Sequence, residues 1–167
     1  MPTHAMTDTA VPLSTYRLQI HPGFTYQQAA EVVPYLEQLG ITHAFVSPIL
    51  QAAPGSTHGY DVVDHSPVSD ENGGEHGFRT LAAALHERGM GMVVDVVPNH
   101  MAIPTPAWLN RKWWDVLAKG TASEFWHWFD IDASNDQRVL VPVLGKPVGE
   151  VLDAGEIHLD EIQAVSY

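Results

Sequence analysis

The sequence predicts an α/β fold in which parallel strands alternate with helices. Two amphipathic helical patterns each lie between strand-like segments, and the third of these segments is apolar on both faces. Strands that alternate with helices in this way form a parallel sheet with right-handed crossovers, either a doubly wound sheet or a (β/α) barrel. Both architectures bind ligands at the carboxyl ends of the strands, so a site is expected in the segments that follow each strand.

The first predicted unit is a strand followed by a helix. Residues 15–20 alternate bulky and polar side chains and stop at a His-Pro-Gly turn. Thr25 and Gln28 match a capping box, and apolar residues then recur with helical spacing until Gly40. Pro34 lies inside this helical pattern, so we expect a kink or a helix boundary there.

The second unit repeats this order with a longer connection. Residues 41–47 are rich in β-branched and aromatic side chains and end at Pro48, which predicts the second strand. A segment rich in Gly, Ser, His and Asp follows over residues 51–74 and is predicted to be a loop. Helical spacing resumes at Phe78, and Gly89 is expected to close this second helix.

The third strand carries a carboxylate inside an apolar run. Residues 92–97 are apolar except for Asp95, a pattern typical of a parallel strand buried on both faces. An isolated buried carboxylate would cost several kcal/mol, so Asp95 must be paired or hydrogen-bonded. We interpret it as a residue that orients a neighbouring site; a surface position is the alternative. Pro98 ends the strand, so Asn99 and His100 project from its end.

After the third strand the pattern changes to that of a separate inserted lobe. Thr105 and Pro106 open a Trp-rich helix, and a short aromatic stretch follows at residues 125–129. Two strand-like runs at 138–144 and 156–159 are separated by Gly/Pro turns. Four tryptophans could form a carbohydrate platform, but a small core built from large side chains is the favoured interpretation. These are Trp113, Trp114, Trp126 and Trp128.

Composition excludes several classes of partner. The chain has 8 Lys and Arg against 20 Asp and Glu, a net charge of −12, so it lacks the basic surface that nucleic acids or anionic membranes require. It has no cysteine, no apolar run long enough to span a membrane, and no signal-peptide pattern at its start. We therefore expect a cytoplasmic protein without a nucleic-acid or membrane partner.

Polar residues cluster at the predicted strand ends. One cluster lies on the first strand, and a second lies in the loop at residues 55–65, where an aromatic ring is flanked by His and Asp. Their members are Arg17, Gln19, His58, Tyr60 and Asp61. An aromatic face beside hydrogen-bonding groups is how proteins hold sugar rings. A solvent-facing arginine and an ordinary solvated loop are the alternatives.

The spacings of two other common sites are absent. A zinc hydrolase would need His-x-His or His-x-x-x-His, and neither spacing occurs in the sequence. A serine hydrolase would need a Gly-x-Ser-x-Gly turn after a strand, and the serines near the second strand do not match it. We therefore expect neither a metal site nor a nucleophilic serine.

Two of these segments resemble the α-amylase family of glycoside hydrolases and transglycosidases. They are Gly59-Tyr60-Asp61 and Asp95-Val96-Val97-Pro98-Asn99-His100, the second of which matches the family's first signature motif, Asp-x-x-x-Asn-His. Six segments together are similar to one branch of the family, whose members form terminal trehalosyl units. In chain order these segments are 16–19, 55–65, 97–102, 113–117, 129–132 and 141–145.

The resemblance implies an isomerase of trehalose biosynthesis. It would convert the reducing-end α-1,4 bond of a maltooligosaccharide to an α,α-1,1 bond by intramolecular transglucosylation, with retention and without a cofactor. Its partner would be the maltooligosaccharide or glucan substrate. Two alternatives stay open: another hydrolase or glucanotransferase of the same family, and a non-catalytic carbohydrate-binding module.

The resemblance also implies roles for individual residues. Tyr60 would stack on the sugar at the cleavage subsite, His100 would hydrogen-bond a hydroxyl of that sugar, and Asp95 would hold the polar network of the site. Asn99 occupies a position that helps to bind calcium in calcium-dependent amylases, but no metal is expected here. Less firmly implied neighbours of the same pocket are Arg17, Gln19, His58 and Asp61.

Finally, the resemblance implies how the chain is organised. It predicts a partial (β/α)8 TIM barrel, with the first three strands and two helices, followed by the start of an inserted lobe after strand three. Residues 1–12 would be a disordered leader, 13–103 the N-terminal part of the barrel, and 104–167 the truncated lobe. The family's nucleophile and acid/base come from later motifs, so we expect them beyond Tyr167 on the remainder of the polypeptide, and the isolated segment is expected to be inactive.

Overall fold

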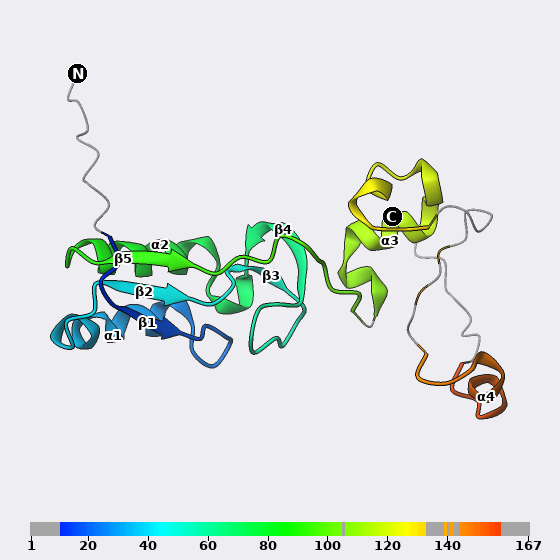
Figure 1. The fold of residues 1–167 in the computed structure, drawn as a ribbon, viewed down its shortest axis with the longest axis horizontal. Coiled ribbons are helices and arrows are strands. Elements are labelled where there is room, and N and C mark those ends of the chain that lie inside the picture. The colour runs from blue at the N-terminus through cyan, green and yellow to red at the C-terminus, as the bar shows by residue number, and fades with distance from the viewer. Residues whose placement is uncertain (1–10, 105, 133–138, 140, 142–143, 158–167) are drawn as a thin grey trace, which may run out of the picture.

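The computed structural model describes residues 11–104, 106–132, 139, 141 and 144–157 (Figure 1). Its strands are β1 (Thr15–Leu18), β2 (His43–Val46), β3 (Leu50–Ala52), β4 (Val62–Val68) and β5 (Gly91–Val94). Its α-helices are α1 (Tyr26–Gln38), α2 (Gly74–His86), α3 (Arg111–Lys119) and α4 (Val148–Asp153). Figure 1 shows the sheet of β1, β2 and β5 at one end, the β3–β4 hairpin next to it, and α3 and α4 beyond the hairpin.

The three predicted strands form one parallel sheet in the order β1-β2-β5. Arg17, Phe45 and Val93 are aligned in register across it. The pairing continues past β5, because the Asp95 backbone N–H donates to the Val46 carbonyl oxygen at 2.9 Å. Side chains alternate between the two faces of a strand, so Arg17, Val93 and Asp95 lie on the same face.

Helices α1 and α2 pack on the opposite face of the sheet, where the main core lies. Its buried members are Leu18, Ile20, Tyr26, Ala29, Val33, Leu36, Ala44, Val46, Leu81, Leu85 and Met90. The predicted capping box is present, since the Thr25 N–H donates to Oε1 of Gln28 at 2.8 Å. Of the two alternatives predicted at Pro34, a kink or a helix boundary, the boundary is wrong, because α1 continues through the proline to Gln38. Val33 and Leu36, on either side of Pro34, are both buried in the core.

The segment predicted to be a loop, residues 51–74, contains most of a β-hairpin. β3 and β4 pair antiparallel with irregular register, so the prediction is wrong for these residues. β3 has only three residues and β4 includes Pro67, so neither shows a clear period-two pattern. Helix α2 also begins earlier than predicted, at Gly74, after a short 3-10 turn.

The third strand is shorter and more exposed than predicted. β5 ends at Val94, and the side chains of Val93 and Val96 are 37% and 63% exposed. Burial on both faces is therefore not observed: α1 and α2 cover one face, and the face that carries Val93 stays partly exposed in the described structure.

The predicted Trp-rich helix is divided at Asn110. A short 3-10 turn at Ala107–Leu109 precedes α3, and the Asn110 side chain caps α3 by accepting the Trp113 N–H at 3.0 Å. Its Nδ2 donates to the Ala102 carbonyl oxygen at 2.9 Å, so the fully buried Asn110 also ties α3 to the chain leaving β5. An N-cap side chain inside the pattern thus explains why one predicted helix becomes two elements.

The core interpretation of the tryptophans is correct for two of the four. Trp113 and Trp126 are buried together with Val116 in a second small core. Trp114 and Trp128 are 39% and 56% exposed, so the structure does not place them in that core. The alternation of buried and exposed rings follows from their positions on the helical turns.

Several predictions fall partly outside the described residues. They concern most of the leader 1–12, Thr105, and much of the strand-like runs 138–144 and 156–159. Between these two runs, where turns were predicted, the structure has α4. The domain boundaries at 12 and 103 stay predictions. No helix in the described parts of the chain is long and apolar enough to cross a bilayer.

The close approach of His43 to β5 gives a testable consequence. A Cβ at Gly91 would lie 2.3 Å from Cδ2 of His43, which is only 7% exposed. Gly91→Ala should therefore lower the free energy of unfolding by about 1–3 kcal/mol, measured by chemical denaturation. The matched control is Gly145→Ala, because no atom lies within 4 Å of a Cβ there. In a His43→Ala background the cost of Gly91→Ala should shrink; an unchanged cost would contradict the account.

Candidate functional site

The centre of the candidate site is a polar network formed by Arg17, Tyr60 and Asp95. The Tyr60 hydroxyl donates to Oδ2 of Asp95, and Nη2 of Arg17 donates to the Tyr60 oxygen at 3.2 Å. Nη1 of Arg17 lies 3.6 Å from the same carboxylate oxygen, and its guanidinium carbon lies 4.9 Å from the centre of the Phe45 ring. The sequence indicates that the Asp95 carboxylate needs partners. Tyr60 and Arg17, which come from other parts of the chain, supply them.

The sheet register explains why these residues meet. Arg17 is in β1 and Asp95 directly follows β5, and both lie on the face opposite the helices. The hydrogen bond to Tyr60, together with the nearby Asp95 charge, raises the pKa of Arg17 despite the opposing effect of slight burial. The guanidinium therefore supplies a permanent positive charge beside Asp95.

Tyr60 is carried by the loop that joins β3 to β4. The backbone of Gly59 has φ +80°, and a Cβ there would lie 2.9 Å from the Pro48 carbonyl oxygen, so the loop packs directly on the end of β2. Gln19 holds the other side of the loop, because its Nε2 lies 3.2 and 3.3 Å from the carbonyl oxygens of Thr57 and His58. These contacts fix Tyr60 over the end of the sheet.

Asp61 and His58 belong to the same loop and form hydrogen bonds within it. The Ser56 hydroxyl donates to Oδ1 of Asp61 and accepts the Gly59 N–H at 3.0 Å. Nδ1 of His58 accepts the Tyr60 N–H at 3.1 Å, and its ring stacks beside the Tyr60 ring at 6.1 Å between centres. The 3.7 Å contact of this nitrogen with Asp61 is too long for a hydrogen bond. Both side chains therefore shape the loop that presents Tyr60.

His100 and Asn99 follow the third strand, as the sequence predicts. Nε2 of His100 lies 3.0 Å from the Tyr60 carbonyl oxygen, to which it donates. Only Nδ1 of His100 is then left for a further hydrogen bond. Asn99 is exposed and does not join the Arg17–Tyr60–Asp95 network; both residues line a neighbouring cavity.

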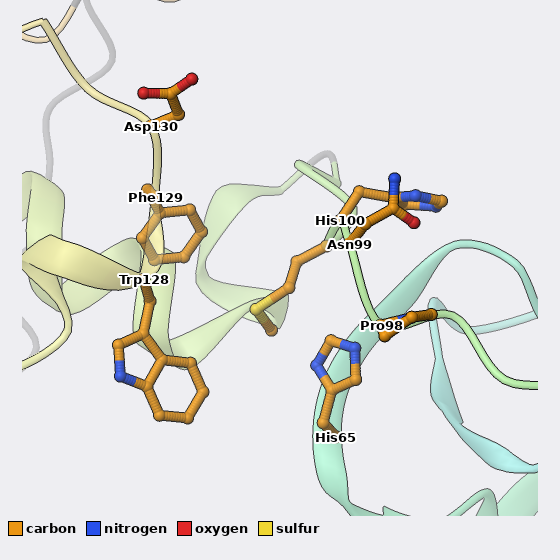
Figure 2. Close-up of a pocket in the computed structure, with 8 residues that line it drawn as sticks. His65, Pro98, Asn99, His100, Trp128, Phe129 and Asp130 are labelled. Atoms are coloured by element: carbon orange, nitrogen blue, oxygen red, sulfur yellow. The ribbon is translucent and has the colours of Figure 1, made fainter.

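This cavity of about 450 Å³ lies between the sheet end and the tryptophan-rich segment. Figure 2 shows the rings of Trp128 and Phe129 on one side and His65 with Pro98 on the other. Nε2 of His65 donates to the Val97 carbonyl oxygen at 2.8 Å, which fixes the histidine ring in the cavity wall. Cavities of this size accommodate small organic ligands or single sugar units.

An ion pair near the cavity joins α3 to β4. Nζ of Lys112, at the start of α3, lies 2.6 Å from Oδ1 of Asp64 in β4 and 5.5 Å from the centre of the Trp128 ring. Burial opposes ionisation of Asp64, but the hydrogen bonds from Lys112 and Ser66 outweigh it and lower the pKa of this carboxyl. The Lys112 side chain is only 13% exposed, so this pair is more shielded than an ordinary surface pair.

The structure brings most of the predicted site residues together. Arg17, Tyr60 and Asp95 form one network. The contacts of the Tyr60 loop involve Gln19, His58 and Asp61, and the adjoining cavity is lined by Asn99 and His100. Their roles toward a substrate stay predictions. Sequence reasoning missed Lys112 and Asp64, whose contact joins residues 48 positions apart and follows no motif. Within the described chain, no group of three or more His, Asp or Glu side chains is placed to hold a metal.

Comparison with known proteins identifies the family of the chain. The family model described as the alpha amylase catalytic domain matches residues 26–143, which is most of the chain. The chain therefore belongs to the α-amylase family.

Individual members of the family are similar to this chain over much of its length. A protein assigned as a maltooligosyl trehalose synthase in Mycobacterium tuberculosis is 46% identical over 161 residues, covering 88% of this chain and 21% of the relative. The structure of maltooligosyltrehalose synthase from Arthrobacter ramosus matches with a TM-score of 0.81 and 51% identity, over 90% of this chain and 19% of that one. The intracellular maltogenic amylase of Bacillus subtilis is 35% identical over 65% of this chain and 17% of its own length. The chain thus spans about a fifth of the length of these relatives.

Removing the Tyr60 hydroxyl should loosen the site network. Tyr60→Phe leaves Arg17 and Asp95 without their shared partner, so we expect a loss of about 1 kcal/mol in the free energy of unfolding. Tyr35→Phe is the matched control, because Tyr35 is 56% exposed on α1, away from the network. Urea denaturation of both variants is the measurement, and equal stability of the two would contradict the network.

The Lys112–Asp64 pair should make stability depend on pH in one direction. The folded-state pKa of Asp64 is lowered, so the pair stabilises above the unfolded pKa of about 4 and is lost as pH falls through the folded-state pKa. Asp64→Asn should therefore destabilise at pH 6 by less than about 1 kcal/mol, since Asp64 is partly exposed, and have little effect near pH 2. Thermal melts at both pH values measure this; a constant difference at the two pH values would be inconsistent with it.

Proposed function

We propose that this chain supplies the sugar-binding part of an intramolecular transglucosylase. The reaction converts the reducing-end α-1,4 bond of a maltooligosaccharide to an α,α-1,1 trehalosyl bond. The observation that carries the proposal is the match to maltooligosyl trehalose synthases at 46% and 51% identity over about nine-tenths of the chain. The Arg17–Tyr60–Asp95 network at the strand ends supports a sugar site in this position.

The same comparisons support a (β/α)8 barrel for the complete polypeptide. In this proposal β1, β2 and β5 are its first three strands, and the chain after residue 103 begins a lobe inserted behind the third strand. The face of the sheet that carries Arg17 and Val93 would then line the barrel interior, which accounts for the exposed valine.

Tyr60 is suited to bind the sugar next to the bond that breaks. Tyr60 is 37% exposed, while its hydroxyl is held by Asp95 and Arg17. A ring fixed in this way offers an apolar face for the C–H surface of a glucosyl unit without losing rotamer entropy on binding. His100, bonded to the Tyr60 carbonyl oxygen, can direct its second nitrogen to a sugar hydroxyl.

Asp95 acts in this scheme as an orienting residue. Its Oδ2 accepts the Tyr60 hydroxyl and faces Arg17, so the lone pairs of this oxygen are engaged. Retaining enzymes need two carboxyl groups roughly 5 Å apart, a nucleophile and an acid/base. We propose that both come from the remainder of the polypeptide and meet the sugar over Tyr60.

The reaction balances without water or a cofactor. The nucleophile displaces the reducing-end glucose as the α-1,4 bond breaks, and the acid protonates the leaving oxygen. The anomeric hydroxyl of the same glucose then attacks the glycosyl-enzyme, with its proton returned to the former acid. The glucose must stay bound and turn between these steps, so water has to be kept out of the site.

A hydrolase or glucanotransferase of the same family is the second candidate, supported by the 35% identity to a maltogenic amylase. A free-standing binding module is disfavoured, because the exposed Val93 and Val96 leave an apolar strand uncovered in the described structure.

Product analysis separates the two enzymatic candidates. The complete polypeptide that carries this chain should convert maltopentaose to a non-reducing product of equal mass, seen as loss of reducing ends without loss of chain length. Release of shorter reducing sugars would indicate the hydrolase instead. Chromatography with mass detection distinguishes the two products, and the 167-residue chain alone should be inactive in the same assay.

A further inference from the structure

We propose that Gln19 is a positioning residue that determines how much of the glycosyl-enzyme reaches the trehalosyl product and how much is lost to water. The inference rests on the proposed function, because it concerns the second step of that reaction. The family resemblance implies Gln19 only as a neighbour of the sugar pocket. In the structure, Gln19 lies between the Arg17 guanidinium and the backbone of the loop that carries Tyr60.

The side-chain amide of Gln19 has hydrogen-bond partners at both of its ends. Nε2 donates to the carbonyl oxygens of Thr57 at 3.2 Å and His58 at 3.3 Å, and Oε1 accepts a hydrogen bond from Nη2 of Arg17 at 3.2 Å. An amide nitrogen has only two hydrogens, so none is left to donate to a sugar hydroxyl. Gln19 therefore acts on the substrate through its protein partners.

Gln19 extends the network that holds the Tyr60 ring. It directly follows β1 and lies two positions after Arg17, so the two side chains lie on the same face of the sheet. Nη2 of Arg17 donates to Gln19 and to the Tyr60 oxygen, and the Tyr60 hydroxyl donates to Asp95. A continuous chain of hydrogen bonds thus runs from the loop backbone to Asp95, and bonds in such a chain strengthen one another.

The tip of the Tyr60 loop, residues 53–61, depends on this amide. The loop is held at its start, where the Gly55 N–H donates to Oε2 of Glu71 at 2.8 Å, and at its end through the Tyr60 hydroxyl. Between these points, Gln19 is the one side chain from outside the loop that hydrogen-bonds to its backbone in the described part of the chain. Both residues that it holds are exposed, so water competes for their carbonyl oxygens.

The position of this loop affects the second step of the proposed reaction. The anomeric hydroxyl of the retained glucose can break the glycosyl-enzyme bond, which gives the trehalosyl product. Water can break it instead: its oxygen bonds to the anomeric carbon, its proton passes to the former acid, and glucose and a shortened maltooligosaccharide are released. A loop that moves off the sheet would free the Tyr60 ring, let the glucose leave and admit water. Holding the loop therefore favours isomerisation over hydrolysis.

Product ratios of two variants of the complete polypeptide test the proposal. Gln19→Met keeps the size of the side chain without the amide. Gln19→Glu keeps an acceptor for Arg17 but sets a carboxylate against the two loop carbonyl oxygens. With maltopentaose, both variants should raise the ratio of released glucose to trehalosyl product about fivefold, because the net effect of one hydrogen bond corresponds to roughly that factor. Chromatography with mass detection measures the ratio.

The matched control is Gln38→Met, which should leave the ratio unchanged. Gln38 is exposed at the end of α1, on the opposite face of the sheet. An unchanged ratio in both Gln19 variants, with or without a loss of total turnover, would overturn the proposal, because a merely structural residue acts in that way. A raised ratio in Gln19→Met with a wild-type ratio in Gln19→Glu would also overturn it, because Gln19 would then serve only Arg17.

Hydrogen–deuterium exchange separates the failure of this proposal from that of the proposed function. The backbone amides of residues 53–61 should exchange faster in Gln19→Met than in the wild type, while those of α1 and α2 keep their rates. Faster exchange in both helices as well would show a general loss of stability and overturn the positioning role. If the wild type makes no trehalosyl product but the loop still exchanges faster in the variant, the transglucosylase proposal fails and Gln19 still holds the loop. If that product forms and neither the exchange nor the ratio changes, the Gln19 inference alone is refuted.

Discussion

The carboxylate of Asp95 is the constraint on which the site depends. It lies at the end of a valine-rich strand, where an ionised group needs partners. The Tyr60 hydroxyl and the Arg17 guanidinium supply them, and they come from segments 35 and 78 positions earlier in the chain (95 − 60 and 95 − 17). To bring Tyr60 there, the β3–β4 loop must fold over the end of β2, which Gly59 permits by its close approach to Pro48. The Asp95–Tyr60 hydrogen bond is thus one of the contacts, together with those of Gln19, Ser56 and Asp61, that hold this loop in place.

Sequence patterns predicted what depends on periodicity and missed what depends on distant contacts. The three parallel strands and their two helices follow from apolar spacing, and Arg17, Tyr60 and Asp95 were recognisable as polar residues at strand ends. The β3–β4 hairpin was missed, because three residues of β3 give no pattern and its partner contains a proline. The division of the Trp-rich helix at Asn110 follows from an N-cap side chain that the apolar spacing alone did not reveal. The Lys112–Asp64 pair arises only from folding, since the two residues are 48 positions apart and match no motif.

The tryptophan-rich segment provides one wall of the cavity beside the site. Asn110 binds the Ala102 carbonyl, and Lys112 binds Asp64, so α3 is joined to the chain after β5 and to β4. These contacts leave Trp128 opposite His65 across a cavity that His100 also lines. The proposed substrate, a neutral glucan, needs no electrostatic attraction to reach such a site, which is consistent with a net charge of −12. Such a ligand requires aromatic rings and hydrogen-bonding groups of the protein that are already held in position before it binds.

The most direct test of this account is a crystal structure of the complete polypeptide with a bound maltooligosaccharide. The measured quantity is the position of each glucosyl ring relative to the Arg17–Tyr60–Asp95 network. The account predicts one ring stacked on Tyr60 within hydrogen-bonding distance of His100, with Oδ2 of Asp95 still bonded to the Tyr60 hydroxyl. A glucan bound elsewhere, with Tyr60 uncovered, would contradict the claim that this network forms the floor of a sugar site.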